Sequence, residues 1–210
     1  METILTAKIK LQPNEEQREL IKETINKVKQ SLNYTSDVAY NNNCISNSIE
    51  LQKLVYYDLR NNFDLKSQMA CNVCNIVAGN YATEKSKGNI TRIFYKKSKL
   101  VYSYNRDYSF TKDGLISIGT YKNRIKVPFT NKGFEKYFDG TWKFAAAELV
   151  YKKGKYFLNI FVKKEFNETD SINNIVGVDF GMRFIITAID SSNNHLFISG
   201  NNIKKQGLIS

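Results

Sequence analysis

The feature that most constrains the fold is a strand-like segment that stands alone at the start of the chain. From Thr3 to Leu11, polar and apolar residues alternate, which is typical of a strand with one buried face. Pro13 and Asn14 end this segment, and the residues that follow carry a helical pattern instead. Because the backbone of a strand needs hydrogen-bonding partners, those partners must come from much later in the chain. The sequence therefore predicts a sheet that is interrupted by a helical insertion.

Three helices are predicted between Asn14 and about Lys87. The first has Asn14 as its N-cap and carries apolar residues at helical spacing as far as about Tyr40. A run of three Asn residues breaks it, Asn47 caps the second helix, and the third begins near residues 65–67. These helices are expected to form a small bundle.

After Arg92 the hydrophobic pattern changes from helical spacing to alternation, which predicts strands. Turn residues at Lys112-Asp113-Gly114 predict a hairpin, and the clearest hairpin joins Phe144–Tyr151 to Tyr156–Val162. Short antiparallel strands with regular turns indicate a small β-barrel, into which the N-terminal strand can pair. The predicted fold class is thus α+β, a barrel with an inserted helical bundle.

Charge is concentrated in the part of the chain that is predicted to form the barrel. The 210 residues have a net charge of +11, and residues 81–165 alone hold nineteen basic and seven acidic side chains, a net charge of +12. A basic surface of this size attracts polyanions, and neutralising phosphates releases counterions. Nucleic acid is therefore the expected partner. A basic face that serves only solubility is the alternative, and binding to a membrane surface is less favoured because these residues do not lie on an amphipathic helix.

The basic residues of this region are interleaved with aromatic residues, an arrangement that suits nucleic-acid binding. Cations can follow the phosphate backbone while aromatic rings stack on unpaired bases. The alternative is that most of these rings belong to the core of the barrel. The candidate binding residues are Lys96, Lys97, Lys99, Arg106, Lys122, Arg124, Lys126, Lys152, Lys153 and Lys155, and the interleaved aromatic residues are Phe94, Tyr95, Tyr102, Tyr104, Tyr108 and Tyr121.

Other features argue against a membrane protein, a disulfide scaffold or a zinc protein. No apolar run is long enough to span a membrane and no signal peptide is evident, so a cytoplasmic protein is expected, nucleoid-associated when bound to DNA. Cys71 and Cys74 have CxxC spacing but no second pair, and they fall within a helical pattern, so we expect buried helix residues. His195 has no evident partner for catalysis.

The motif Gly177-Val178-Asp179-Phe180-Gly181 carries the most chemical information. Burying a carboxylate in an apolar strand is costly unless it is hydrogen-bonded or binds a cation, and Gly181 would allow a ligand to approach the backbone. Alternatively, Asp179 caps a turn at the end of a strand. RNase H-like nucleases, which hold Mg²⁺ with such an acid, fit better than actin-like or sugar-kinase ATPases, because Met182-Arg183 replaces the phosphate-binding hydroxyls of the ATPases.

Four segments occur in a characteristic order. They are the strand end Gln12-Pro13-Asn14-Glu15-Glu16-Gln17, the helix start Leu65-Lys-Ser-Gln68, the basic turn Lys152-Lys153-Gly154-Lys155 and the motif from Gly177 to Arg183. With these segments the chain resembles, over nearly its whole length, the TnpB (OrfB) proteins of insertion sequences. These proteins are RNA-guided DNA nucleases related to the type V CRISPR effectors.

The resemblance implies three domains. Residues 1–12 and 88–170 would form an OB-like wedge barrel, residues 13–87 a helical recognition insertion, and residues 171–210 the first strands of an RNase H-like RuvC domain. Guide RNA and target DNA would be the partners. Asp179 would be the first catalytic carboxylate and a Mg²⁺ ligand.

Two departures from the family pattern bear on activity. Phe184 replaces the Asn that is commonly found three residues after the second glycine of the motif, and the chain stops at Ser210, before the family's other catalytic acids and its zinc ribbon. Because one carboxylate cannot hold two Mg²⁺ ions, we expect this polypeptide alone to lack nuclease activity. A nuclease-dead RNA-guided regulator of DNA is the alternative function, and an ATPase fragment is less favoured.

Overall fold

The computed structural model describes residues 2–166, 175–181 and 184–199. Within them the chain forms two compact units, residues 2–165 and the segment from Phe166 onward. The polar segment 167–174, whose composition predicts a linker, and Met182-Arg183 of the motif lie outside the described residues. The domain bounds taken from the resemblance stay a prediction.

The N-terminal strand β1 (Glu2–Leu11) finds its partners late in the chain, as predicted. It pairs antiparallel with β8 (Lys155–Glu165) along its whole length, from Glu2 opposite Glu165 to Leu11 opposite Tyr156. Its other edge pairs with the short strand β6 (Phe129–Thr130). Ala7, Ile9 and Leu11 turn to the core, which matches the alternation in the sequence. β1 is therefore an internal strand rather than an edge.

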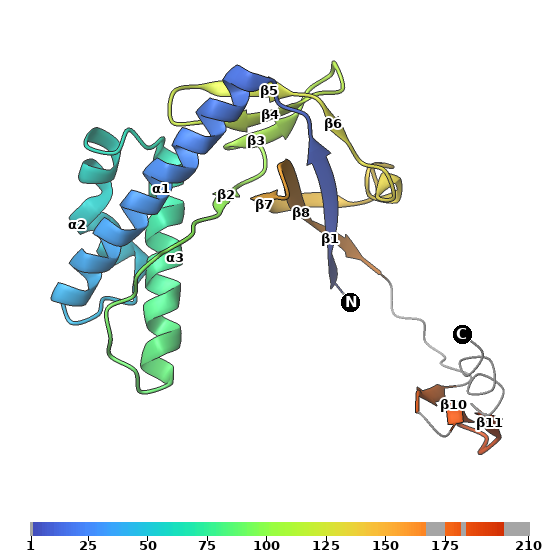
Figure 1. Ribbon diagram of the computed structural model, residues 1–210. Coiled ribbons are helices and arrows are strands. Elements are labelled where there is room, and N and C mark those ends of the chain that lie inside the picture. Colours follow the sequence, from blue (N-terminus) through green and yellow to red (C-terminus); the bar gives the residue numbers. More distant parts are fainter. Residues whose placement is uncertain (1, 167–174, 182–183, 200–210) are drawn as a thin grey trace, which may run out of the picture. The chain divides into compact units, whose positions relative to one another are not determined.

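Two antiparallel sheets enclose one core in the first unit (Figure 1). The larger has the order β2-β7-β8-β1-β6, where β2 is Leu100–Tyr102 and β7 is Lys143–Lys152; the smaller is β3-β4-β5 (Tyr108–Phe110, Ile116–Gly119 and Arg124–Val127). A single helical turn, η1 (Glu135–Tyr137), follows β6.

Aromatic residues join these two sheets. The Phe110 ring of the smaller sheet lies 5.5 Å from that of Phe129 and 4.9 Å from that of Phe144, both in the larger sheet. Tyr102 Oη donates to the Gly119 carbonyl at 2.9 Å, which satisfies a buried hydroxyl across the core. The two sheets of the barrel thus pack around one core, and the short antiparallel strands that the pattern predicted are confirmed.

The inserted helices are α1 (Glu15–Asn41), α2 (Ser48–Asn61) and α3 (Ser67–Ser86), each beginning within two residues of its predicted start. Asn14 and Gln17 form the predicted capping box, with Asn14 Oδ1 accepting from the Gln17 N–H at 2.9 Å. Asn72 of α3 donates to the Val101 carbonyl at 2.8 Å and so ties the bundle to the barrel. The α+β fold class is confirmed. None of the described helices combines the length and the apolar character that crossing a membrane requires.

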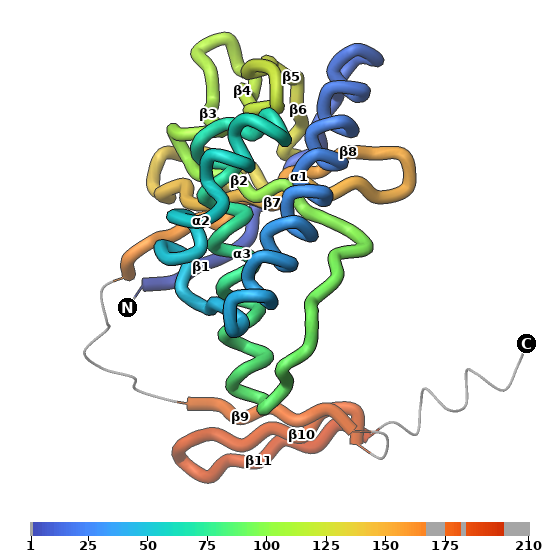
Figure 2. The backbone as a smooth tube through the Cα atoms, turned by 90° about the vertical axis from the view of Figure 1, so that its left-hand side faces the viewer, coloured from blue at the N-terminus to red at the C-terminus, as the bar shows by residue number. Residues whose placement is uncertain are grey.

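The chain returns from the bundle to the barrel through a segment without regular structure, residues 88–99, which we call the strap. The strap leaves the end of α3, runs back along α1 and enters β2 (Figure 2). The second unit is a separate antiparallel sheet of order β11-β10-β9, made of Val176–Asp179 (β9), Phe184–Asp190 (β10) and His195–Ser199 (β11).

Candidate nucleic-acid interface

A cleft of about 900 Å³ lies between α1, the strap and the β7–β8 hairpin. We call it the basic cleft. The side chains that give it its character are six cations and two tyrosines: Arg18, Lys22, Lys29, Lys96, Lys97, Lys99, Tyr151 and Tyr156. Glu15 and Glu19 also line it, but the six cations outnumber these two acids, so the lining is strongly cationic. A concave surface of one charge focuses the electric field on a polyanion.

Two segments far apart in the sequence supply these cations. Arg18, Lys22 and Lys29 recur on one face of α1, because residues four or eleven positions apart in a helix project in nearly the same direction. The strap supplies Lys96, Lys97 and Lys99.

Half of the cations of the basic cleft are paired at the surface. The nitrogen-to-oxygen distances are 3.7 Å for Arg18–Glu15, 3.4 Å for Lys22–Glu19 and 2.8 Å for Lys99–Glu148. Exposed ion pairs of this kind contribute little to stability, so a phosphate can replace the carboxylate at small cost. Among the described residues, Lys29, Lys96 and Lys97 have no ion-pair partner.

The aromatic wall of the basic cleft comes from the β7–β8 hairpin. The Tyr151 side chain is 58 % exposed, and its ring centroid lies 4.8 Å from that of the buried Tyr156. Burial raises the pKa of Tyr156 above that of a free tyrosine. Tyr151 thus presents an open ring face, held by a buried neighbour, of the kind on which an unpaired base can stack.

The hairpin tip extends the basic surface. Lys152, Lys153 and Lys155 are all exposed and lie between Tyr151 and Tyr156 in the sequence. Lys153 and Gly154 have φ of 49° and 75°, the two left-handed positions of a tight hairpin turn. The predicted hairpin is confirmed.

The four remaining candidate cations lie apart from the basic cleft. Arg106, Lys122 and Arg124 line a second hollow, of about 470 Å³, beside the start of α3. Lys126 forms a 3.2 Å ion pair with Asp113. Of the ten candidates, the structure therefore gathers six along the basic cleft and its hairpin tip.

Arg124 is held by the protein itself. Its guanidinium donates to Ser117 Oγ at 3.0 Å, to the Arg106 carbonyl at 2.9 Å and to Ser109 Oγ at 2.9 Å. These bonds join β5 to β3 and β4 and use most of the donors of the side chain. Arg124 thus supports the small sheet.

The aromatic residues interleaved with the cations are mainly core residues, the alternative that the sequence left open. Tyr102 and Tyr108 are fully buried and Tyr121 nearly so, whereas the Phe94 ring is 64 % exposed. Burial raises the pKa of both Tyr102 and Tyr108 well above that of a free tyrosine. Base stacking is therefore excluded for these two residues, and Tyr151 offers the exposed ring instead.

Sequence reasoning missed Arg18, Lys22 and Lys29, because the net charge of residues 1–80 is zero. Counting charge by segment hides three cations on one face of α1, because the acidic residues of the same helix cancel them. The recurrence of cations on one face of α1 is the signal that could have revealed them.

Asp179 is the last residue of β9, where it lies opposite Thr187 of β10. The four side chains of β9 are exposed, so the expectation of a carboxylate buried in an apolar strand is wrong. The Gly181 N–H donates to the Phe184 carbonyl at 3.1 Å, and a Cβ at Gly181 would lie 3.1 Å from that same oxygen. The close approach of the Phe184 carbonyl therefore accounts for this glycine without a ligand.

Asp190, the other acid of this sheet, stabilises the turn that follows it. Its carboxylate accepts from the N–H groups of Ser192 and Asn194 at 2.9 and 2.7 Å. Within the described residues, no three His, Cys, Asp or Glu side chains gather as a metal site would require.

The cysteines and the histidine have structural surroundings. Cys74 is buried in α3, and burial raises the pKa of its thiol to about 12, whereas Cys71 on the same helix is partly exposed. Cys74 is thus the buried helix residue that was expected. The His195 ring lies 6.2 Å from that of Phe197, its neighbour on the same face of β11.

The fold of the chain is similar to part of a solved Cas12f1 structure. A cryo-EM structure described as a Cas12f1–sgRNA–target DNA complex is similar, with a TM-score of 0.54 at 12% sequence identity, over 90% of this chain and 50% of that chain. A CRISPR-Cas12f ternary complex gives a TM-score of 0.48 at 9% identity, with the same coverage. The chain thus spans about half the length of these proteins. No protein family and no curated protein matches the sequence.

Proposed function

We propose that this chain is the nucleic-acid-binding part of an RNA-guided DNA endonuclease of the TnpB or Cas12 kind, with guide RNA and target DNA as its partners. The observation that carries the proposal is the basic cleft, in which six cations from α1 and the strap face an aromatic wall. The shared fold supports it, since the similar structure is a complex with sgRNA and target DNA.

In this proposal the cations neutralise phosphates and release their counterions, while Tyr151 stacks on an unpaired base. Lys29, Lys96 and Lys97 contribute most, because no carboxylate has to be displaced from them. Lys152, Lys153 and Lys155 extend the same charged path along the hairpin.

Binding of a fluorescein-labelled RNA–DNA hybrid of roughly 20 base pairs tests the proposal. Fluorescence anisotropy between 50 and 300 mM salt gives the dissociation constant and its salt dependence. If about six cations contact phosphate, the log–log slope of the affinity is about −4 to −5. Replacing Lys29, Lys96 and Lys97 with Ala should reduce the magnitude of the slope by about 2 to 2.7.

A matched control replaces Lys53, Lys85 and Lys132, three exposed lysines outside the basic cleft. This variant has the same net charge as the cleft variant and should keep nearly the wild-type slope. Affinity that does not depend on salt, or an equal effect of the two triple variants, would refute a role for the basic cleft. Purified protein should also carry RNA, which nuclease digestion and electrophoresis would reveal.

Asp179 is the proposed Mg²⁺ ligand of the nuclease. As a single exposed carboxylate it offers one ligand group, and the described residues include no group of three or more His, Cys, Asp or Glu side chains that could hold a metal ion. These residues alone therefore do not make a two-metal site, and we derive no step of cleavage through Mg²⁺. Cleavage that is lost in Asp179→Ala would favour the nuclease, whereas binding without cleavage would favour the alternative of a nuclease-dead regulator.

A further inference from the structure

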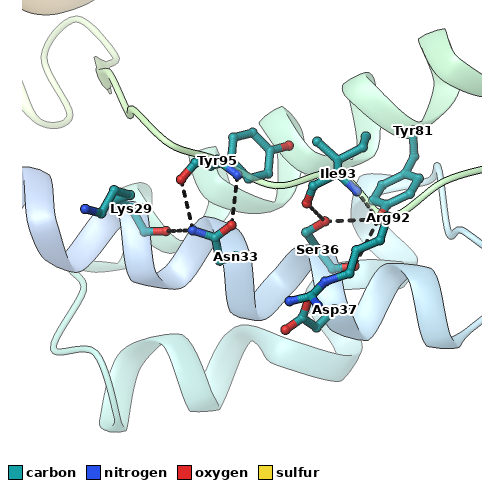
Figure 3. Close-up of polar contacts among 8 residues, drawn as sticks. All are labelled: Lys29, Asn33, Ser36, Asp37, Tyr81, Arg92, Ile93 and Tyr95. Atoms are coloured by element: carbon teal, nitrogen blue, oxygen red, sulfur yellow. Dashed lines mark hydrogen bonds and ion pairs between the residues drawn. The ribbon is translucent and has the colours of Figure 1, made fainter.

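The strap is held to the bundle by side chains of α1 and α3 rather than by regular backbone pairing. Asn33 Nδ2 donates to the Tyr95 carbonyl at 3.1 Å, and Asn33 Oδ1 accepts from the Tyr95 N–H at 2.9 Å (Figure 3). One amide side chain thus satisfies both backbone groups of Tyr95, as a neighbouring strand would.

Two residues earlier in the sequence, at Ile93, the strap is bound in the same way. Ser36 Oγ donates to the Ile93 carbonyl at 2.6 Å, and the Ile93 N–H donates to the Tyr81 hydroxyl at 3.3 Å (Figure 3). Both Ser36 and Tyr81 are buried. Arg92 forms an ion pair with Asp37 of α1. Alternate residues of the strap are therefore fixed against the helices.

The alternation determines which strap residues remain outside. Because the backbone groups of Ile93 and Tyr95 are bound to the helices, the intervening Phe94 and the following Lys96 and Lys97 are exposed. The last two line the basic cleft. Asn33 binds the residue directly before them, and Ser98, directly after them, donates to the Ile25 carbonyl of α1 at 3.0 Å. Of these two contacts, Asn33 is the one that satisfies both backbone groups of a strap residue, and its Nδ2 also donates to the carbonyl of Lys29, another cation of the cleft, at 3.1 Å.

We propose that Asn33 is a positioning residue for nucleic acid, because it fixes the register of the strap on α1 and so holds Lys96 and Lys97 in the basic cleft. This inference rests on the proposed function. Without the amide, the Tyr95 backbone loses both partners, and the strap can shift along α1. The two lysines would then keep their charge but lose their place opposite Arg18, Lys22 and Lys29.

A double-mutant cycle on the full chain tests this role. The four proteins are the wild type, Asn33→Ala, the double variant Lys96→Ala/Lys97→Ala, and the combination of all three changes. The probe is the labelled RNA–DNA hybrid. If Asn33→Ala loses two phosphate contacts, the magnitude of its salt slope falls by about 1.4 to 1.8. When the salt concentration rises from 50 to 200 mM, the affinity of the wild type should therefore fall by a factor about 7 to 12 times larger than that of Asn33→Ala.

The triple variant should bind the hybrid with the same affinity as Lys96→Ala/Lys97→Ala, within about twofold. The reason is that Asn33 acts through the two lysines, which both variants lack. Independent, additive losses would overturn the positioning role while leaving the proposed function intact. Absence of salt-dependent binding by the wild type would overturn both.

Asn75→Ala is the matched control, since Asn75 is exposed on α3 and does not touch the strap. It should leave the affinity and its salt slope unchanged. If Asn33→Ala does not fold, Asn33→Asp takes its place in the cycle. The carboxylate keeps the acceptor for the Tyr95 N–H but faces the carbonyls of Lys29 and Tyr95 without a donor, so the same loss is expected.

Discussion

Tyr34 joins α1 to α2 through a single polar contact. Its hydroxyl donates to Asp58 Oδ2 at 2.5 Å, and this bond to a carboxylate raises the pKa of Tyr34 to about 12. A folded-state pKa above that of the unfolded chain means that the bond stabilises the fold fully below about pH 10. This stabilisation is lost as the pH rises through about 12.

Tyr34→Phe should therefore lower the free energy of unfolding by about 1 kcal/mol near neutral pH, a modest value because the pair is partly exposed. The difference between wild type and variant should shrink above pH 10. Urea denaturation at several pH values measures both effects. Tyr57→Phe is the control, since Tyr57 is 75 % exposed on α2 and should show no such pH-dependent difference. Equal curves for wild type and Tyr34→Phe would contradict the bond's role.

At the same scale, residue type alone did not reveal which cations are available to a ligand. Lys97 and Arg124 both carry a positive charge within a basic segment. One lines an open cleft and the other donates to Ser109 and Ser117. The two side chains differ in whether hydroxyl and carbonyl groups lie within hydrogen-bonding distance, and those groups come from other parts of the chain. The sequence could therefore predict a basic region but not its open members.

At the scale of elements, Gln17 links α1 to the barrel as well as capping the helix. Its Oε1 accepts from the Asn14 N–H at 3.2 Å, while its Nε2 donates to the Lys126 carbonyl of β5 at 2.9 Å. The sequence predicted the cap from the spacing of Asn14 and Gln17. It could not predict the second bond, because its acceptor lies more than a hundred residues away.

Gln17→Glu separates these two tasks. A carboxylate still accepts from the Asn14 N–H, but it cannot donate to the Lys126 carbonyl and would face it with a negative charge. The free energy of unfolding should fall by about 0.5 to 1.5 kcal/mol, the net contribution of one hydrogen bond at an exposed position. Chemical denaturation measures this change. Gln30→Glu, at an exposed position of α1, supplies the control, and an equal loss there would point to a general effect of charge on the helix.

At the scale of the whole molecule, the first unit has a core of its own. Both sheets and all three helices contribute to one buried cluster, whereas Ala188 is the one described residue of the second unit that counts among the buried apolar side chains. The hydrophobic period predicted the type and order of these elements because each has one buried face. The basic cleft escaped prediction, because its walls come from three separate segments.

A chain of residues 1–166 should accordingly keep the cooperative thermal transition of the 210-residue chain. Its melting temperature should lie within about 3 °C of that of the longer chain, the shift that about 1 kcal/mol produces at this size. Calorimetry or circular dichroism measures the transition. A chain lacking residues 2–11 should instead lose it, since β1 is an internal strand of the larger sheet. A broad, non-cooperative transition of the 1–166 chain would show that the second unit is required for folding.

The pairing of β1 with β8 also sets the order of events during synthesis. Glu2 lies opposite Glu165, so the first strand to leave the ribosome waits for one of the last strands of its unit. At about 5–20 residues per second, that wait is roughly 8 to 30 s. Helices form in about a microsecond, so the bundle can fold while β1 still has no partner. In the cell, closure of the barrel is therefore timed by translation, and chaperones that shield extended segments have a defined period in which to act on β1.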